Sequence, residues 1–171
     1  EQIVGQFLQD FIRNKDRFSF PEKIGEGITL HRAIDTFTDA HPEIHEAKKI
    51  FSPLVRLYAG AFVDVAFDYF LANSLPDKIL KEHSEKVYRV LRNHEEFLPE
   101  NFLRMLDRME KENWLYNYRS DWGIEFSIRN VLNKAKYLNK NLAVFEVFLN
   151  HKPQLQYHFD HFFPDLVAEV Q

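Results

Sequence analysis

The sequence predicts an all-α protein, a single helical domain spanning residues 1–171 around one central apolar helix. Three observations favour this fold class. Only five glycines are present, and no alternating runs rich in valine, isoleucine and threonine stand out, so strands have little support. Seven prolines divide the chain into stretches of helical length. The length allows a substantial core, and 17 phenylalanines predict that this core is rich in aromatic rings.

Apolar periodicity places the helices in order along the chain. We expect them at residues 2–14, 27–39, 42–51, 53–74, 76–94, 99–118, 122–135 and 140–170, the last one broken near Pro153. The clearest start signal is Ser52-Pro53, a capping residue followed by proline, and His41-Pro42 resembles a second one. Residues 53–74 are apolar on almost every side, which is typical of a central helix surrounded by others.

Composition excludes several classes of function. The formal net charge of −4 gives no support to a nucleic-acid binder. Absence of cysteine excludes disulfides, thiolate nucleophiles and zinc–thiolate sites, and it suits a cytoplasmic location. Residues 54–75 are interrupted by Arg56, Asp64 and Asp68, so we expect no membrane span. The first residue is not methionine and lies in a helical pattern, so we expect a short segment to precede it. Oligomeric state is left open.

Two aspartates interrupt the apolar stretch FVDVAFDYFL, residues 62–71. Asp64 and Asp68 are four residues apart, so they project from one face of a helix, one turn from each other. We expect both to be buried, and a buried carboxylate is strongly disfavoured without a partner. The partner is either a divalent cation or a set of arginines and capping hydroxyls from neighbouring helices.

Two other helices carry residues of the same chemistry. In LHRAID, residues 30–35, His31 and Asp35 are four apart, a spacing at which imidazole and carboxylate can ligate one metal from one helical face. An ordinary surface pair explains a lone occurrence of this spacing equally well. In GQFLQDFIRN, residues 5–14, Asp10 sits among apolar neighbours, although an exposed aspartate on an amphipathic helix is again the ordinary interpretation.

The combined ligand set is rich in oxygen, and its members are Asp10, His31, Asp35, Asp64 and Asp68. Such a set suits Mn²⁺ or Mg²⁺ better than a structural zinc. A divalent cation among helices polarises a phosphoryl oxygen and activates water. The residues alone therefore indicate a metal-dependent phosphoester hydrolase.

Four stretches carry a resemblance to a known family: GQFLQDFIRN (5–14), GITLHRAIDTFTDAHPEI (27–44), DVAFDYFLAN (64–73) and NWLYNYRSDWGI (113–124). On these motifs the chain resembles the bacterial acyl carrier protein phosphodiesterases, relatives of the helical HD-type metal phosphohydrolases. The resemblance implies an HD-like bundle that hydrolyses the phosphodiester between 4′-phosphopantetheine and a serine of acyl carrier protein, with Mn²⁺ as the metal. The implied products are apo-acyl carrier protein and free phosphopantetheine.

The resemblance also implies roles for individual residues. Asp10 matches the position most readily assigned to catalysis, His31 and Asp35 match a His-Arg-x-Ile-Asp run, and Asp64 and Asp68 match an Asp-Val-x-x-Asp run. We assign Asp10, His31 and Asp35 to both catalysis and metal binding, and the aspartate pair to metal binding.

This chain departs from the family pattern at two positions and at its start, where family members usually have a short segment that contains a histidine. Gln6 stands where the family usually has asparagine, and Tyr69 stands where many members have histidine. The second change removes one candidate ligand or proton donor.

The implied partner, acyl carrier protein, is small and acidic, so docking should use basic side chains. The candidates are Arg13, Arg32, Arg56 and Arg119. We favour Arg32, which lies beside His31 and can hold the substrate phosphate bidentately, and we interpret Arg56 as an ordinary surface residue.

Other polar and aromatic groups receive structural interpretations. We expect Trp114 and Trp122 in the core, and the histidines at 41, 45, 151, 158 and 161 to be structural or exposed. Two alternative functions stay open: a helical metal phosphohydrolase for a nucleotide or another small phosphodiester, and a helical module that binds carrier proteins without hydrolysing them.

Overall fold

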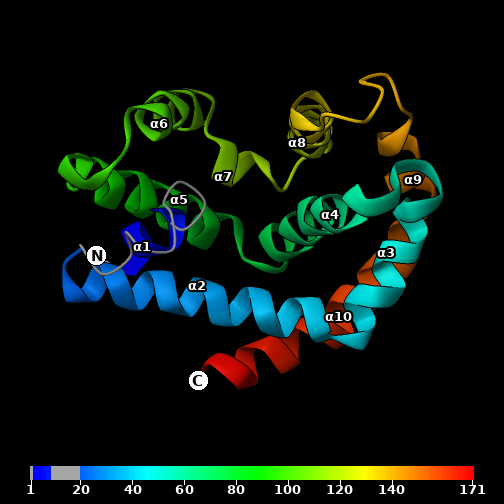
Figure 1. Cartoon of the computed structure of the whole chain (residues 1–171), viewed down its shortest axis with the longest axis horizontal. Coiled ribbons are helices and arrows are strands. Elements are labelled where there is room, and N and C mark those ends of the chain that lie inside the picture. The colour runs from blue at the N-terminus through cyan, green and yellow to red at the C-terminus, as the bar shows by residue number, and fades with distance from the viewer. Residues whose placement is uncertain (1, 9–19) are drawn as a thin grey trace. The chain divides into compact units, whose positions relative to one another are not determined.

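The computed structural model describes residues 2–8 and 20–171, and these form helices joined by short turns, without strands (Figure 1). The helices are α1 (Gln2–Leu8), α2 (Glu22–Ala40), α3 (Pro42–Val55), α4 (Ala59–Ser74), α5 (Asp77–Arg92), α6 (Glu100–Glu112), α7 (Trp114–Asn117), α8 (Asp121–Lys134), α9 (Val144–Asn150) and α10 (Lys152–Val170). Short 3₁₀ turns lie at Arg56–Tyr58 and Glu95–Phe97. The predicted all-α class is confirmed.

The predicted helix boundary at Ser52-Pro53 is wrong. Pro53 lies inside α3, which continues to Val55 and ends where Arg56 adopts a φ of 53°. Proline removes one backbone hydrogen bond near the end of the helix, while the buried Phe51 and Val55 side chains hold this segment in the core. The other start signal is confirmed, because His41 caps α3 and its Nδ1 accepts a hydrogen bond from the Glu43 amide at 3.1 Å.

Other observed helix boundaries can be compared with those predicted from the sequence. Helix α2 begins at Glu22, five residues before the predicted start at residue 27, directly after Pro21. The predicted helix 99–118 is divided at Asn113, whose left-handed backbone ends α6. The predicted break near Pro153 is confirmed between α9 and α10. Of the predicted helix 2–14, α1 covers the first part, and residues 9–14 lie outside the described residues.

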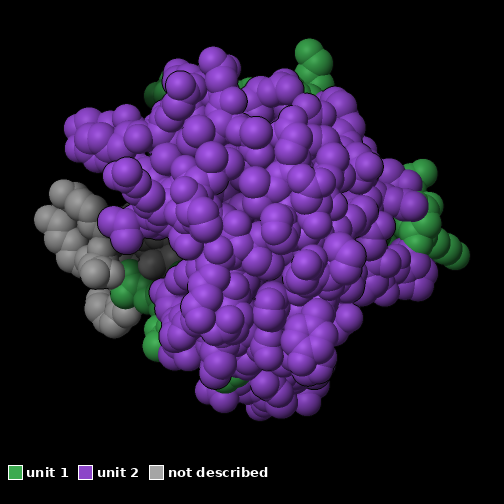
Figure 2. Space-filling view, turned by 90° about the vertical axis from the view of Figure 1, so that its right-hand side faces the viewer, with its two compact units in different colours: residues 1–37, 77–115, 170 green, residues 38–76, 116–169, 171 purple. Residues whose placement is uncertain are grey.

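The chain forms two compact units, each assembled from separate stretches of sequence (Figure 2). Unit 1 takes residues 1–37, 77–115 and 170, and unit 2 takes residues 38–76, 116–169 and 171. The single domain expected over residues 1–171 stays a prediction.

Unit 1 has an apolar core between α1, α2, α5 and α6. Its buried members are Val4, Ile24, Ile28, Val87, Tyr88, Leu91, Leu98, Phe102, Leu106 and Met109. Helices α1 and α2 approach so closely that a Cβ on Gly5 would overlap the Ile24 backbone oxygen, and one on Gly27 would overlap the Gln2 backbone.

Unit 1 also contains a charged cluster that links α5, the turn after it and α6. Arg92 lies 2.7 Å from Asp107, 2.8 Å from Glu110 and 3.1 Å from Glu95. The hydrogen bonds to these carboxylates raise the pKa of Arg92 above its ordinary value, although partial burial acts in the opposite direction.

Unit 2 is built on α4, which packs against α3 and α8, while α9 contacts α3 and α8. Its core is rich in aromatic rings, as predicted. The Phe67 ring of α4 lies 5.4 Å from Phe159 and 5.7 Å from Phe162, both on α10. The Phe70 ring lies 6.1 Å from Phe148 on α9.

The stretch Pro42–Ser74 is long and apolar enough to cross a membrane by length and composition alone. In unit 2 it is interrupted at Arg56–Tyr58, and both of its halves bury apolar side chains in the aromatic core. A core helix passes the same test of length and composition.

Candidate functional site

The expected burial of Asp64 and Asp68 is wrong: both residues are exposed. Helix α4 buries Ala59, Phe62, Val63, Ala66, Phe67, Phe70 and Ala72, and this set leaves one stripe of the helix uncovered. The two aspartates lie on that stripe, at positions i and i+4. Their presence in an apolar segment therefore needs no buried counter-ion, because the segment has a solvent-facing side within unit 2.

The Asp68 carboxyl nonetheless has an unusual environment. Burial and, to a lesser extent, the neighbouring Asp64 charge raise the pKa of Asp68 from 3.8 to about 7. Much protein therefore surrounds the carboxyl, although the residue as a whole is exposed to water. The shift is upward because both causes disfavour the charged form of the carboxyl.

His31 and Asp35 form a second pair, on α2 in unit 1. The His31 Nε2 and Asp35 Oδ2 atoms are 3.4 Å apart, so the helical spacing does bring them together as predicted. The His31 side chain is about a quarter exposed at 27%, and the Asp35 side chain is more exposed at 57%. Both side chains are thus partly exposed to solvent.

The five proposed metal ligands therefore fall into three groups. Asp10 lies outside the described residues, as does Arg13. His31 and Asp35 belong to unit 1, and the α4 aspartates belong to unit 2. Among residues 2–8 and 20–171, no group of three or more histidine and acidic side chains is arranged to hold a metal ion. His31 and Asp35 are close enough to share a ligand, Asp64 and Asp68 lie one helical turn apart on α4, and the assembly of the full set stays a prediction.

A residue that the sequence analysis did not single out connects α4 to the turn before α8. The Asn73 Nδ2 donates to the Tyr69 carbonyl at 2.8 Å and to the Arg119 carbonyl at 3.0 Å. The Arg119 guanidinium stacks on Tyr116, 5.5 Å from the ring centre, and donates to its hydroxyl at 3.2 Å. Asn73 ends the stretch DVAFDYFLAN, and the connection joins that motif to NWLYNYRSDWGI.

The motif NWLYNYRSDWGI contains the N-cap and the first turn of α8. The Ser120 Oγ accepts a hydrogen bond from the Gly123 amide at 2.9 Å and donates to the Asn117 carbonyl at 2.8 Å. A Cβ on Gly123 would overlap that carbonyl, so glycine is required at this close approach. The motif therefore contains a serine cap followed by a contact that only glycine permits.

Trp122 is not in the core, contrary to the sequence prediction. It is 54% exposed and stacks on Phe126, one turn further along α8, with ring centres 5.4 Å apart. The buried residues of α8 are Gly123, Ile124, Ile128 and Leu132, so Trp122 is not among those that face the core. Trp114 is half-buried against the unit 1 core, and its indole donates to Glu112 at 2.9 Å.

Tyr69, at the position where the resemblance implies histidine in many members, has a packing role. Its ring lies 5.4 Å from Phe148, and the Lys152 Nζ sits 4.6 Å from the ring centre. The same ammonium lies 4.0 Å from an Asp121 oxygen. A cation above an aromatic face is attracted by the ring quadrupole, so Tyr69 connects α4 with α9 and α10.

The remaining histidines assigned to structure make ordinary contacts. His41 Nε2 lies 2.9 Å from Asp165, and His158 Nδ1 lies 2.6 Å from Glu43, which connects α3 with α10. The other three contact backbone carbonyls: His45 that of Asp39, His151 that of Val147, and His161 that of Tyr157.

Comparisons with known proteins agree with the resemblance. A family model described as "Acyl carrier protein phosphodiesterase" matches residues 1–166. A protein of that name from Enterobacter sp. (strain 638) is 27% identical over 178 residues, covering 99% of this chain and 90% of the relative. One from Salmonella agona (strain SL483) is 28% identical over 172 residues, covering 98% and 89%. No solved structure matches the chain.

Proposed function

This chain belongs to the acyl carrier protein phosphodiesterase family, an enzyme family that removes phosphopantetheine from holo-acyl carrier protein, and we propose that a divalent cation serves the reaction. The observation that carries the proposal is the family match over residues 1–166. We propose Mn²⁺ as the cation and Asp10, His31, Asp35, Asp64 and Asp68 as the residues that bind it.

Two features of the described residues support a cation. The His31 Nε2 and Asp35 Oδ2 atoms are 3.4 Å apart on one helical face, and imidazole and carboxylate groups at this spacing would both be able to hold one ion. Burial and the Asp64 charge raise the pKa of Asp68 to about 7, and a nearby cation would offset both effects. The oxygen-rich chemistry of the set fits Mn²⁺ or Mg²⁺.

The reaction is the addition of water to phosphorus with loss of the serine oxygen. The water oxygen forms the new bond, the phosphorus–serine oxygen bond breaks, and the serine oxygen gains a proton. The products are a serine hydroxyl on apo-carrier protein and the phosphomonoester 4′-phosphopantetheine. A bound divalent cation supplies Lewis acidity toward the phosphoryl oxygens.

The residues of the chain divide the remaining tasks. One carboxylate of the set, with Asp10 as our first assignment, accepts the proton of the attacking water. Arg32, next to His31 on α2, holds the phosphoryl oxygens as their negative charge increases. The Arg32 carbonyl accepts from the Thr36 hydroxyl at 2.9 Å, so its backbone is part of a regular helix.

The test is mass spectrometry of holo-acyl carrier protein after incubation with the enzyme, in Mn²⁺ or in EDTA. We expect loss of the phosphopantetheine mass only with Mn²⁺, and a rate at least about 100-fold lower in Asp10→Ala and His31→Gln, because each change removes a ligand. Asp160→Asn is the matched control, since Asp160 is exposed on α10 and its carboxylate accepts only from Gln156, at 2.8 Å, among the described contacts.

Different outcomes separate the parts of the proposal. Full activity in EDTA would exclude the role of the cation, and full activity of Asp10→Ala would exclude the assignment of Asp10. Faster turnover of a chromogenic phosphodiester than of holo-carrier protein would favour the small-substrate alternative. A second readout is thermal stabilisation by Mn²⁺, which Asp68→Asn should reduce and Asp160→Asn should not.

A further inference from the structure

The corner between α3 and α4 holds an exposed side chain on a strained backbone. Arg56, the first residue of the turn Arg56–Tyr58, has φ 53° and ψ −122°, a combination that L-residues rarely adopt. Leu57, the next residue, is fully exposed. Strained backbone persists where the surrounding structure imposes it, and it is concentrated at functional positions.

The loop between α8 and α9 lies against this corner. The Tyr137 amide donates to the Tyr58 hydroxyl at 3.4 Å, so the loop and the corner are side by side, as Figure 1 also shows. Tyr137 is 79% exposed, and the Lys136 Nζ lies 5.3 Å from the centre of its ring. Two large apolar side chains, Leu57 and Tyr137, therefore reach solvent on neighbouring segments of unit 2.

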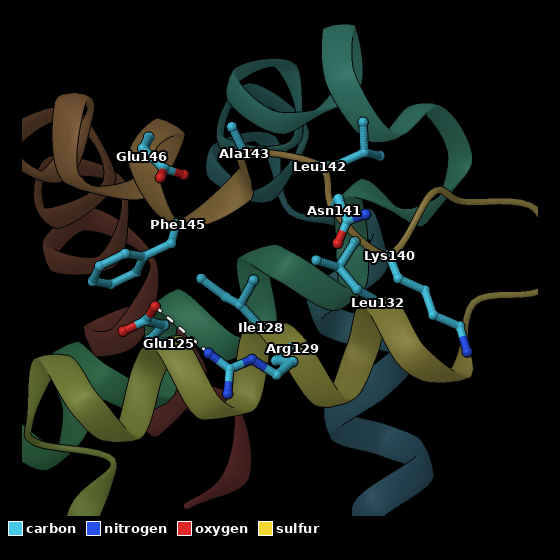
Figure 3. A pocket seen from close by; sticks show the side chains of 10 residues that line it. All are labelled: Glu125, Ile128, Arg129, Leu132, Lys140, Asn141, Leu142, Ala143, Phe145 and Glu146. Carbon is cyan, nitrogen blue, oxygen red and sulfur yellow. Dashed lines mark ion pairs between the residues drawn. The ribbon is translucent and has the colours of Figure 1, made fainter.

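The same loop continues into a pocket of about 200 Å³ against α8 (Figure 3). Lys140 and Leu142 line it from the loop, and Ile128 and Leu132 line it from α8. Arg129 also lies there and is paired with Glu125 at 3.7 Å. The pocket thus adds a recess with a mixed apolar and charged lining, formed in part by the same loop that carries the exposed tyrosine.

The charges on this face are mostly positive. Arg56, Lys136 and Lys140 are all exposed, and within residues 2–8 and 20–171 the structure records no ion pair for any of them. Acidic Glu125 and Glu146 lie at the far side of the pocket, on α8 and α9. Cations without acidic partners around exposed apolar side chains are suited to bind a negatively charged protein surface.

We propose that Arg56, Leu57, Lys136, Tyr137 and Lys140 form a docking surface for the acidic carrier protein. The inference rests on the proposed function, which makes an acidic protein the substrate. Tyr137 is the main apolar contact, because tyrosine is enriched among the residues that provide most of the binding energy of interfaces, and Leu57 adds exposed apolar area beside it. The three cations attract the partner's carboxylates and so increase the association rate. Salt screens this attraction and weakens it.

The test is a titration of the enzyme with apo-acyl carrier protein, which binds without being cleaved, at low salt. We expect Leu57→Ser to raise Kd at least tenfold and the double change Lys136→Glu with Lys140→Glu to do the same. The controls are on α5 of unit 1. Ile79→Ser also replaces an exposed aliphatic side chain, although Ile79 is 47% exposed and Leu57 101%, and Lys81→Glu with Lys86→Glu makes the same change in charge. We expect these controls to change Kd less than twofold.

One further variant separates a loss of binding from a loss of folding, because its melting temperature is measured together with its Kd. Arg56→Gly removes a cation and also relieves the strained backbone, so we expect a higher melting temperature together with a weaker Kd. Misfolding would weaken binding as well, but it would lower the melting temperature. A melting temperature that rises without any change in Kd would remove Arg56 from the docking surface.

The outcomes distinguish this inference from the proposed function. If the wild-type protein hydrolyses the substrate and the surface variants bind the carrier protein as well as their controls do, the inference is overturned and the proposed function stands. Tight binding that depends on Leu57, without hydrolysis, would support the docking surface and refute the function. If the wild-type protein runs as a dimer in size-exclusion chromatography and Leu57→Ser runs as a monomer, the surface binds a second copy of this chain and the proposal is overturned.

Discussion

Replacing Arg56 with glycine should stabilise the protein, because the native backbone at this position is unfavourable for any residue with a Cβ. Arg56 combines φ 53° with ψ −122° at the end of α3. A left-handed conformation costs an L-residue roughly 1–2 kcal/mol, and positions outside the main wells cost on the order of 1–3 kcal/mol. Glycine populates positive φ about as readily as negative φ.

The magnitude follows from two opposing effects. Relief of strain at Arg56 contributes about 2 kcal/mol, the middle of the range for such positions. Glycine makes the unfolded chain more flexible, which offsets about 0.5–1 kcal/mol of this gain. The arginine side chain is exposed and has no recorded ion pair within the described residues, so its loss should matter by less than about 0.5 kcal/mol. We expect a net stabilisation of about 1 kcal/mol, or ~3 °C in Tm for a chain of this size.

Urea unfolding followed by far-ultraviolet circular dichroism measures this difference, with two controls. Arg56→Ala removes the side chain and keeps the strain, so it should lie within about 0.5 kcal/mol of wild type. Asn113→Gly changes a residue with φ 50° and ψ 58°, a left-handed conformation that asparagine tolerates, so it should also change little. If Arg56→Gly is no more stable than Arg56→Ala, the strain argument is wrong.

Three further predictions test the site and the fold. The pKa of Asp68 is raised from 3.8 to about 7, so the folded metal-free protein holds this proton more tightly than the unfolded chain. The stability that this proton contributes is present below about pH 4 and is lost as pH rises through 7. In thermal melts, Asp68→Asn should therefore stabilise the apoprotein at pH 8 and not at pH 4. Gly123→Ala should destabilise by roughly 2–3 kcal/mol in urea, because its Cβ would overlap backbone, whereas Gly25→Ala, with open space around it, should stabilise by about 0.5–1 kcal/mol. Arg92→Lys should lower unfolding free energy by about 1–2 kcal/mol through lost hydrogen bonds, and 1 M NaCl should shrink the difference between the two proteins.

Local chemistry in the sequence determined much of the fold. His41-Pro42 begins α3 because the imidazole accepts from a nearby amide, and α9 and α10 separate close to Pro153. His31 and Asp35 lie together because a helix places positions i and i+4 on one face, whatever surrounds it. Interactions over a few residues are sufficient for these predictions.

Other properties depended on contacts between distant segments. The apolar stretch around Asp64 and Asp68 does not reveal which side of α4 stays uncovered, because that depends on where α3, α8 and the Phe-rich α10 pack. Pro53 is an apparent helix start in sequence, yet burial of its neighbours keeps it inside α3. Asn73 acquires a role only when the Arg119 carbonyl arrives from another part of the chain.

The sequence by itself therefore determined the helical class, the family and the ligand-like pairs, since each depends on residue type and short spacing. Only the tertiary structure decided that the two α4 aspartates face solvent, that Trp122 is at the surface, and that Leu57 is presented on a strained turn. The physical reason is that exposure is a property of the neighbours that cover a side chain, and those neighbours come from segments far apart in sequence.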